Sequence, residues 1–459
     1  MGPERFDVIV VGAGPGGEVA VYRLAPRGLK VALVERELIG GECSYWGCVP
    51  SKTLLRPAEI AAEGRKGFGT RPSPLEWSEI AAYRDYMVRD YDDAKQIEEY
   101  GRMGVTVVKA PGRLVGPGAV EAGGRRLEAT HVVVATGSDP LALPIEGLAE
   151  AGYWTNREAT GLKRVPDSVL VQGGGPVAVE LSQMLARYGA TVTLVQRSAS
   201  ILKNQEPEAG RLVTQSLESE GVRVLTGTTV QAVERRETGV DVRRVVTLSD
   251  GSTVEVAEFL AATGRRPRVA GAGLETVGLG EVRALAIDDL GRVRNGPDGL
   301  WALGDVTGVA LFTHVAKYQG RGVAANILAA RGEGEERPLE YDAVPRVVFC
   351  DPEIAAVGLT EARAAAAGVA VKAATIDLTS VTRSYTYERE PRGLLKLLAA
   401  QDDGRIVGAT AVGPLASEWI EVAAVAVRAR LTASFLRDSV FQFPTFSEVY
   451  VAAAEQLTA

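Results

Sequence analysis

Histidine and cysteine, the side chains most often used as bases and redox groups, are scarce in this sequence of 459 residues. It has two histidines, His131 and His314, and three cysteines. Three cysteines cannot form the disulfide framework of a small secreted protein, and with so few histidines and cysteines we predict no metal site. The apolar stretch Val8–Val11 near the N-terminus is too short for a membrane span or a signal-peptide core. We therefore expect a cytoplasmic protein that does not bind membranes.

An excess of positive charge is also missing. Lysine and arginine number 51 and aspartate and glutamate 58, which gives a net charge of −7, and there is no long basic run. A nucleic-acid partner is therefore disfavoured. The hydrophobic share of 46% and the charged share of 24% are those of an ordinary soluble globular protein. At the usual size of about 150 residues per domain, the length suggests about three domains.

Glycine, in contrast, is abundant, and its clusters mark nucleotide-binding turns. An apolar strand over Asp7–Val11 leads into a GxGxxG pattern at Gly12, Gly14 and Gly17. A helix-like stretch follows, and then a second apolar strand that ends at Glu35. Such glycines allow a pyrophosphate to approach a helix N-terminus, and the acid can bind the ribose hydroxyls. The pattern predicts a dinucleotide site.

The same pattern occurs a second time, after Ser168, as GxGxxA at Gly173, Gly175 and Ala178. The strand that follows, Thr191–Val195, is succeeded by Gln196 and Arg197, with Lys203 six residues further on. An acid there would repel a 2′-phosphate, whereas these cations attract it, so we expect NADPH rather than NADH. Each module closes on a similar apolar strand, the first with Thr136 and Gly137 at its end and the second with Gly264. A third glycine signal follows, with Asp305 just after a short apolar strand.

A cysteine pair lies inside the first module. Cys43 and Cys48 are five residues apart, in the stretch GGECSYWGCVPSK. Pro50 and the run after it predict that Cys48 lies at or just before a helix start, where backbone dipoles stabilise a thiolate. In a cytosolic protein this arrangement indicates a redox-active pair.

Together these motifs resemble the pyridine nucleotide-disulfide oxidoreductases, the family of dihydrolipoamide dehydrogenase, glutathione reductase and mercuric reductase. The resemblance covers nearly the whole chain and implies an α/β fold with two Rossmann-like dinucleotide-binding domains and a C-terminal α+β dimerisation domain. It implies an FAD-binding domain in two parts, residues 1–150, which include the cysteine pair, and residues 271–340. Residues 151–270 would bind NAD(P)H, and residues 341–459 would form a homodimer whose active site is shared between subunits.

The resemblance also assigns roles to residues. Cys48 would be the thiol next to FAD, and Cys43 the interchange thiol that attacks the acceptor. Lys52 and Glu180 match an ion pair beside the flavin. His314 matches a stretch that lies along the flavin ring. The first glycine turn, Glu35, the Thr136–Gly137 strand end and Asp305 would bind FAD, and the second turn and Gly264 would bind NADPH.

The C-terminal motif departs from the family pattern. Family members typically end in HPTxSE, whose histidine, paired with the glutamate, moves the proton of the substrate dithiol. Here Phe443 replaces that histidine, and Glu448 is kept. The usual imidazole base is therefore absent, so ordinary dihydrolipoamide dehydrogenase activity is not expected to be fast.

Four functions stay open at this point. The leading one is an NADPH-dependent FAD oxidoreductase that reduces a disulfide or other small acceptor through Cys43 and Cys48. A quinone or dye reductase would transfer electrons directly from the flavin. A thioether-cleaving carboxylase like the 2-ketopropyl coenzyme M enzyme also has Phe at the position of Phe443, but it replaces the glutamate that is kept here as Glu448. The last is a non-catalytic flavoprotein redox sensor.

Overall fold

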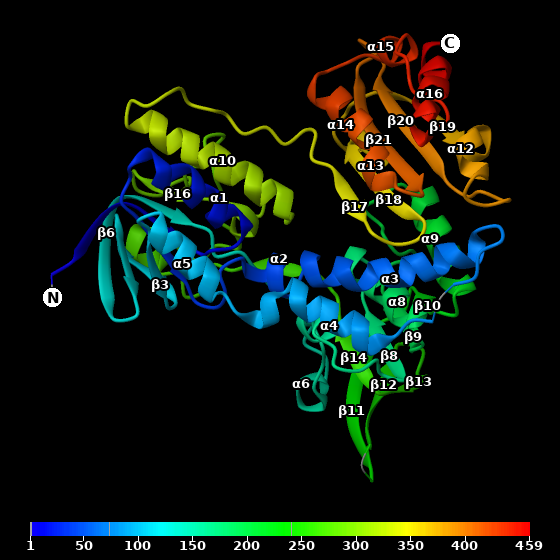
Figure 1. The fold of residues 1–459 in the computed structure, drawn as a ribbon, viewed down its shortest axis with the longest axis horizontal. Coiled ribbons are helices and arrows are strands. Elements are labelled where there is room, and N and C mark those ends of the chain that lie inside the picture. The colour runs from blue at the N-terminus through cyan, green and yellow to red at the C-terminus, as the bar shows by residue number, and fades with distance from the viewer. Residues whose placement is uncertain (1, 73, 240) are drawn as a thin grey trace. The chain divides into compact units, whose positions relative to one another are not determined.

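The chain forms two units, and the first contains both the first glycine turn and the cysteine pair. The computed structural model describes residues 2–72, 74–239 and 241–459. Unit 1 comprises Met1–Ser51, Ala82–Leu141 and Arg265–Glu340 (Figure 1). Unit 2 comprises Lys52–Ala81, Ala142–Gly264 and Tyr341–Ala459. The long helix α3 (Cys48–Lys66) therefore begins in unit 1 and continues in unit 2.

Unit 1 is built on one mixed sheet in the order β3-β2-β1-β6-β5-β4, with β16 also paired to β6. The strands are β1 (Glu4–Val11), β2 (Val31–Glu35), β3 (Thr106–Lys109), β4 (Gly112–Gly116), β5 (Ala119–Ala122), β6 (Arg125–Val134) and β16 (Leu300–Ala302). The pairs that involve β1, β2, β3 and β16 are parallel, whereas β4, β5 and β6 pair antiparallel. The carboxyl ends of the parallel strands therefore share one edge.

Alternate residues of β1 serve two separate hydrophobic cores. Val8 and Val10 pack with α1 (Pro15–Leu24) and α10 (Thr313–Ala330). Ile9 and Val11 point to the opposite face, into a core shared with β5 and η3 (Leu274–Val277). Because successive strand residues face opposite sides, a nearly continuous apolar strand indicates a sheet covered on both faces.

Unit 2 contains the second nucleotide-binding sheet, which is parallel throughout, in the order β10-β9-β8-β14. Its strands are β8 (Ser168–Gln172), β9 (Thr191–Gln196), β10 (Arg223–Thr226) and β14 (Glu258–Ala261). The helices α8 (Pro176–Arg187) and α9 (Pro207–Ser219) follow β8 and β9. A small antiparallel sheet inserts before β14, from β11 (Val230–Thr238), β12 (Asp241–Leu248) and β13 (Thr253–Val256). The β12–β13 hairpin turns at Asp250 and Gly251.

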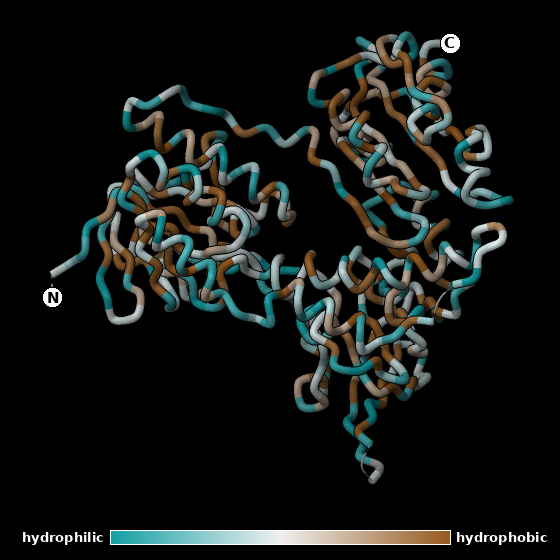
Figure 2. Tube along the Cα trace, in the orientation of Figure 1, coloured by the Kyte–Doolittle hydropathy of each residue, from teal (hydrophilic) through white to brown (hydrophobic). Residues whose placement is uncertain are grey.

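The C-terminal part of unit 2 is an antiparallel five-stranded sheet in the order β17-β18-β21-β20-β19. The strands are β17 (Arg346–Val348), β18 (Glu353–Gly358), β19 (Val371–Asp377), β20 (Leu394–Ala400) and β21 (Ile406–Gly413). Helices α14 (Glu421–Arg428) and α16 (Val449–Thr458) pack on the sheet. Figure 2 shows the hydrophobic colour concentrated along these strands.

The predicted fold class is confirmed, with two dinucleotide-binding sheets and a C-terminal α+β part. The four-part division at residues 150, 270 and 340 stays a prediction. The chain crosses between the two units after Leu141, Gly264 and Glu340, and also after Ser51 and Ala81. Within the described part of the chain, no helix has both the length and the apolar character that a membrane crossing requires.

Candidate active site

The cysteine pair lies at the junction of two helices. Cys43 is in the short helix α2 (Gly41–Tyr45), and Cys48 is the first residue of α3, as predicted. Cys48 is exposed and Cys43 is partly buried. The pKa of the Cys43 thiol is raised well above its usual range, first by its hydrogen bond to Cys48 and next by burial. Cys43 therefore holds its proton tightly, and Cys48 is the member of the pair better placed to ionise.

Thr313 brings a second helix start to Cys48. It is the first residue of α10, and its Oγ1 lies 3.4 Å from the Cys48 Sγ. Helix N-termini carry partial positive charge, so the starts of α3 and α10 both favour a thiolate at Cys48. Thr313 was not predicted from the sequence, because no pattern distinguishes it from its neighbour His314 in that stretch. The His314 side chain is exposed, and its ring stacks on Phe312 at 5.2 Å between centroids.

The first glycine turn connects β1 to α1 and leaves the helix start open. Gly12 has a φ of +109°, and a Cβ there would lie 2.2 Å from the carbonyl oxygen of Ala135. At Gly17 a Cβ would lie 2.0 Å from the Gly12 oxygen. Gly14 is the N-cap of α1, and nothing lies within 4 Å of its Cβ position. Glu35 ends β2, and its Oε2 accepts a backbone N–H of the turn at 2.7 Å. This is the geometry that a dinucleotide pyrophosphate requires.

Asp305 lies just after β16, in η4 (Gly304–Thr307), at the same edge of the sheet. Its Oδ2 accepts a hydrogen bond from the Ser138 Oγ at 2.6 Å. The Ser138 Oγ in turn accepts a hydrogen bond from the Arg265 Nε at 2.8 Å. Burial raises the pKa of Asp305, and the bond from Ser138 opposes that rise. The Asp305 carboxylate is therefore held in place by Ser138, which is itself held by the Arg265 guanidinium.

The strand end at Thr136 and Gly137 belongs to the same region of unit 1. The Thr136 Oγ1 donates to the Arg268 carbonyl oxygen at 2.7 Å, and the Gly137 carbonyl accepts the Arg268 N–H at 2.9 Å. The Nε of Arg268 also donates to Asp139 at 2.8 Å. Sequence reasoning missed Ser138, Arg265 and Arg268. The two arginines follow the closing strand of the second module, but β15 (Arg265–Pro267) pairs with β7 (Ser138–Pro140) of unit 1.

The second glycine turn repeats the geometry of the first. Gly173 has a φ of +129°, and a Cβ there would lie 2.3 Å from the carbonyl oxygen of Ala262. Gly175 is the N-cap of α8, with nothing within 4 Å of its Cβ position. Ala178 is fully buried where the helix meets its sheet. Gly264 follows the closing strand with a φ of +127°.

The acid of the first turn has no counterpart in the second. Gln196 ends β9 where Glu35 ends β2, and a Cβ at Gly174 would lie 2.8 Å from the Gln196 side chain. Arg197 and Lys203 are exposed on the loop that follows. The edge that would meet the adenosine ribose is therefore neutral to basic, as the sequence predicted.

Lys52 and Glu180 form the predicted ion pair, within unit 2. The Lys52 Nζ lies 2.7 Å from the Glu180 Oε2, and Glu180 is buried. The Glu180 Oε1 accepts the backbone N–H of Phe349 at 2.9 Å, and Lys52 lies over the Phe349 ring at 4.6 Å from its centroid. Lys52 is four residues, or about one turn, after Cys48 in α3. Phe349 was missed, since no local pattern links it to α3.

Aromatic side chains surround the segment between the cysteines. The Tyr45 ring lies 5.6 Å from the Trp46 ring and 6.3 Å from the Tyr91 ring, between centroids. Tyr91 ends three consecutive residues with left-handed backbone, after Arg89 and Asp90. Non-glycine residues adopt this conformation at a cost of about 1 to 2 kcal/mol each. Tyr45 is fully buried, while Trp46 and Tyr91 remain partly exposed.

The C-terminal motif begins α16. Phe443 is 72% exposed. The Glu448 Oε2 accepts the backbone N–H of Thr445 at 3.1 Å, as half of a capping box around this turn. The two residues belong to unit 2 and Cys43 to unit 1. Since the family resemblance implies an active site shared between subunits, we propose that Phe443 and Glu448 face Cys43 across the dimer interface.

Known families match nearly the whole chain. Residues 6–320 match the family described as pyridine nucleotide-disulphide oxidoreductase, and residues 344–454 match its dimerisation domain. The chain belongs to the pyridine nucleotide-disulphide oxidoreductase family. This family is FAD-dependent and uses a pyridine nucleotide, and the dimerisation domain implies a homodimer.

Several relatives align over their full lengths. A mercuric reductase of Streptomyces lividans is 35% identical, and the alignment covers 99% of this chain and 96% of the relative. A dihydrolipoyl dehydrogenase of Thermus scotoductus is 34% identical, with 99% and 98% covered. The crystal structure of LpdA from Mycobacterium tuberculosis is 29% identical with a TM-score of 0.86, and 99% and 100% are covered. These relatives place the chain among flavoprotein disulfide reductases, whose members differ in acceptor.

The residues of unit 1 fit an FAD. The open start of α1 suits the pyrophosphate, and Glu35 lies beside it at the end of β2 for the adenosine ribose. Asp305 offers a fixed carboxylate at the same edge of the sheet for the other half of the cofactor. The site therefore has a polar group for each end of a long dinucleotide.

We expect the Asp305→Leu variant to bind FAD about 10-fold more weakly or worse. Leucine removes a charged hydrogen-bond partner and leaves the Ser138 hydroxyl without its acceptor. Flavin absorbance per subunit after extensive dialysis measures the effect. Asp298→Leu is the matched control, because Asp298 is exposed on a loop of the same unit. Equal flavin retention in both variants would contradict the role of Asp305.

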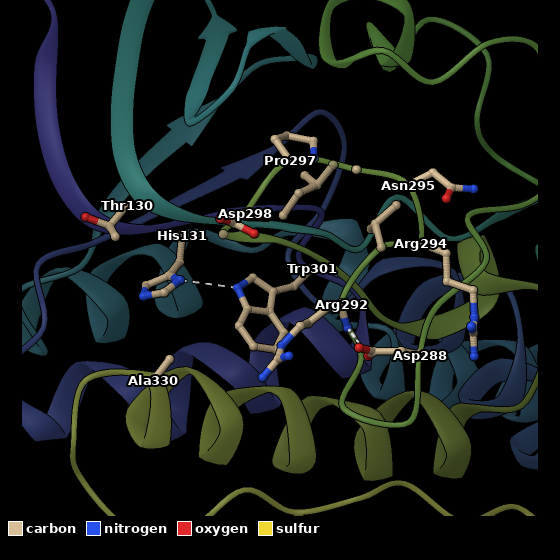
Figure 3. A pocket seen from close by; sticks show the side chains of 14 residues that line it. Thr130, His131, Asp288, Arg292, Arg294, Asn295, Pro297, Asp298, Trp301 and Ala330 are labelled. Atoms are coloured by element: carbon tan, nitrogen blue, oxygen red, sulfur yellow. Dashed lines mark hydrogen bonds between the residues drawn. The ribbon is translucent and has the colours of Figure 1, made fainter.

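A separate pocket of about 860 Å³ lies at the start of β16 and beside the middle of β6 (Figure 3). Figure 3 shows His131 and Trp301 side by side, and the Trp301 Nε1 donates to the His131 Nδ1 at 3.2 Å. His131 is therefore neutral, with its proton on Nε2, and burial lowers its pKa. Thr130 and Gly299 line this pocket. Both residues precede the carboxyl ends of β6 and β16, which lie at the sheet edge that carries the first glycine turn. His131 is therefore a buried side chain that packs in the wall of this pocket.

Proposed function

We propose that this protein is a homodimeric, NADPH-dependent FAD disulfide reductase that passes electrons through Cys43 and Cys48 to a small-molecule acceptor. The observation that carries the proposal is the asymmetry of the pair. Cys48 is exposed at the start of two helices, whereas Cys43 is partly buried and has a raised pKa. A pair in which one thiol ionises first suits sequential thiol–disulfide exchange.

The exchange itself uses only the two thiols of this chain. FAD, when bound, carries two electrons from the nicotinamide to the cysteine pair. After a base removes its proton, Cys43, the interchange thiol by resemblance to the family, attacks one sulfur of the acceptor disulfide and displaces the first thiol. Cys48 then attacks the Cys43 sulfur, displaces the second thiol and re-forms the Cys43–Cys48 disulfide. The net reaction consumes NADPH, one proton and a disulfide, and yields NADP⁺ and two thiols.

Proton transfer at Cys43 limits which acceptors the protein can reduce quickly. The raised pKa of Cys43 keeps this thiol protonated, so attack requires a base to remove the proton. Phe443 cannot serve as one. Acceptors that need less proton transfer at Cys43, or that bind thiols strongly, are therefore favoured over lipoamide. Several relatives are mercuric reductases, and soft metal ions prefer thiolate ligands, so Hg²⁺ belongs among the acceptors tested.

A second candidate is direct electron transfer from the flavin to a quinone or dye. The partly exposed rings of Trp46 and Tyr91, 6.2 Å apart, offer a surface for a planar acceptor next to the cysteines. Alkylating the reduced enzyme separates the two functions. Disulfide reduction should cease after alkylation, whereas quinone reduction should continue if the flavin delivers its electrons directly.

The decisive experiment is a steady-state screen of NADPH oxidation. The acceptors are lipoamide, low-molecular-weight disulfides, Hg²⁺, quinones and thioether ketones. We expect turnover with at least one thiol-reactive acceptor and weak turnover with lipoamide. Turnover with no acceptor at all would instead support a non-catalytic redox sensor. Cleavage of a thioether ketone would support the carboxylase-like function.

We expect the Arg197→Glu variant to lower the ratio of kcat/KM for NADPH to kcat/KM for NADH by about 10-fold or more. The new carboxylate would repel the 2′-phosphate that Arg197 is placed to attract. Arg211→Glu is the matched control, since Arg211 is exposed on α9, the helix that follows β9 and the loop with Arg197. Equal kcat/KM for both nucleotides in the native enzyme would reject the NADPH preference.

A further inference from the structure

The loop that carries Arg197 and Lys203 is tightly held although both side chains are exposed. It runs from the end of β9 to the start of α9. In its middle, the Leu202 N–H donates to the Gly174 carbonyl at 2.7 Å, which ties the loop to the second glycine turn. Leu202 is buried and has a φ of +51°, a strained conformation for a leucine. A strained, buried residue persists only where its surroundings fix it.

Glu206 fixes the far end of this loop to the C-terminal sheet of the same unit. It is the N-cap of α9 and is only 3% exposed. Its Oε1 accepts the backbone N–H of Glu361 at 2.8 Å, and its Oε2 lies 3.3 Å from the Nζ of Lys396. Both partners belong to the C-terminal part of unit 2, on α11 (Glu361–Ala366) and β20.

Lys396 is an unusual residue for its position. The strand β20 reads LLKLLAA and is buried along its whole length, yet this lysine lies in its middle with a side chain 4% exposed. Its Nζ also lies 2.6 Å from Glu361 and 2.9 Å from Glu208. Burial alone would lower the pKa of Lys396, but the hydrogen bonds to Glu361 and Glu208 raise it above its usual value. The lysine is therefore charged at every physiological pH.

Stability is a poor explanation for this cluster. Taking charges out of water costs about as much as their pairing returns, and an apolar residue would match the rest of β20. Buried ion pairs do, however, fix one geometry, because neither partner can leave the other without a large penalty. Here the geometry that is fixed is the end of the loop with Arg197 and Lys203.

We propose that Glu206 and Lys396 are positioning residues for the nicotinamide nucleotide, which hold the Arg197–Lys203 loop in the conformation that receives the 2′-phosphate of NADPH. This inference rests on the proposed NADPH preference. Neither side chain touches the nucleotide in this account. They act by linking the loop to β20, so the C-terminal sheet contributes to nucleotide selection.

Binding of two adenosine nucleotides to the flavin-loaded dimer tests the proposal. Adenosine 2′,5′-bisphosphate carries the 2′-phosphate, and adenosine 5′-monophosphate lacks it. We expect Glu206→Ala and Lys396→Met each to weaken binding of the bisphosphate about 10-fold by calorimetry, with less than about 2-fold change for the monophosphate. The double variant should be no worse than Glu206→Ala alone, because Lys396 acts on the loop only through Glu206.

Milder and control variants keep the test valid if Lys396→Met does not fold. Glu206→Gln retains an acceptor for the Glu361 N–H but loses the charge, so an intermediate loss of about 3-fold is expected. Glu361→Gln removes the charge of a carboxylate that lies closer to Lys396 than Glu206 does, and leaves Glu206 and the Glu361 N–H in place, so bisphosphate binding should stay near that of the native enzyme. Circular dichroism melting establishes that each variant is folded.

Different results overturn different claims. If the native enzyme binds both nucleotides equally, the NADPH preference is wrong, and this inference is wrong with it. If the native enzyme prefers the bisphosphate and folded Glu206→Ala and Glu206→Gln bind it equally well, only the positioning role is wrong. The same holds if both nucleotides weaken equally, because that is the result of a general structural role.

Discussion

Replacing either Cys43 or Cys48 by serine is expected to lower disulfide reduction by about 10³-fold or more. In the proposed mechanism each thiol performs a bond-forming step that a serine hydroxyl cannot perform at neutral pH, and the two act as a unit, so the double variant should be no slower than the single ones. The measurement is kcat/KM for the best disulfide found in the acceptor screen, with NADPH saturating.

The third cysteine provides the matched control. Cys350 is buried in unit 2, and its Sγ donates to the Pro352 carbonyl at 3.2 Å, a contact that a serine hydroxyl can also make. Burial raises its pKa well above the usual range, so it is not a reactive thiol. Cys350→Ser should therefore keep most of the activity. Rapid disulfide reduction by the Cys43→Ser/Cys48→Ser double variant would refute the proposed electron path.

Replacing Phe443 by histidine is expected to raise lipoamide turnover by about 10-fold or more. A general base typically contributes about 10²- to 10⁴-fold. At the dimer-interface position that we propose for Phe443, an imidazole would supply the base that the raised pKa of Cys43 calls for. The gain should follow deprotonation of the new imidazole, with an apparent pKa near 6.5. The pH profile of kcat/KM for lipoamide therefore distinguishes a new base from a mere change of shape.

Two further variants sharpen this test. Glu448 now caps its own turn through Thr445, and a glutamine can keep that capping bond while losing the charge that would orient an imidazole. Adding Glu448→Gln to Phe443→His should therefore remove much of the gain. Phe435→His is the control, since Phe435 is another exposed phenylalanine of the C-terminal part. If native lipoamide reduction is already fast, or if Phe443→His leaves it unchanged while quinones are reduced quickly, direct transfer from the flavin becomes the better explanation.

The sequence could predict features that depend on neighbours along the chain. Both glycine turns, the helix start at Cys48 and the antiparallel C-terminal strands follow from local patterns of glycine, proline and apolar residues. Lys52 and Glu180 are 128 residues apart, and their pairing was predicted only through the resemblance to a family. Physical reasoning on the sequence alone would have treated them as two ordinary surface charges.

Contacts between distant segments without a local signature could not be predicted. Arg265 and Arg268 follow the second module in the sequence but belong to unit 1, because β15 pairs with β7. Thr313 reaches Cys48 only because α10 starts beside α3. Lys396 interrupts an apolar strand, and its contacts are with three glutamates from two other segments, which no local pattern around Lys396 indicates.

The geometry of the two glycine turns has a consequence for how this sequence can vary. A side chain at Gly12 would clash with the carbonyl oxygen of Ala135, and one at Gly173 with the carbonyl oxygen of Ala262. Each glycine is therefore needed because of a closing strand far along the chain. In each module the glycine turn and the end of the closing strand, Ala135–Gly137 or Ala262–Gly264, therefore meet a single steric requirement. A substitution in either closing strand that moves this carbonyl changes which residues its turn tolerates. Mutational tolerance in the two segments should therefore be linked within each module and independent between modules.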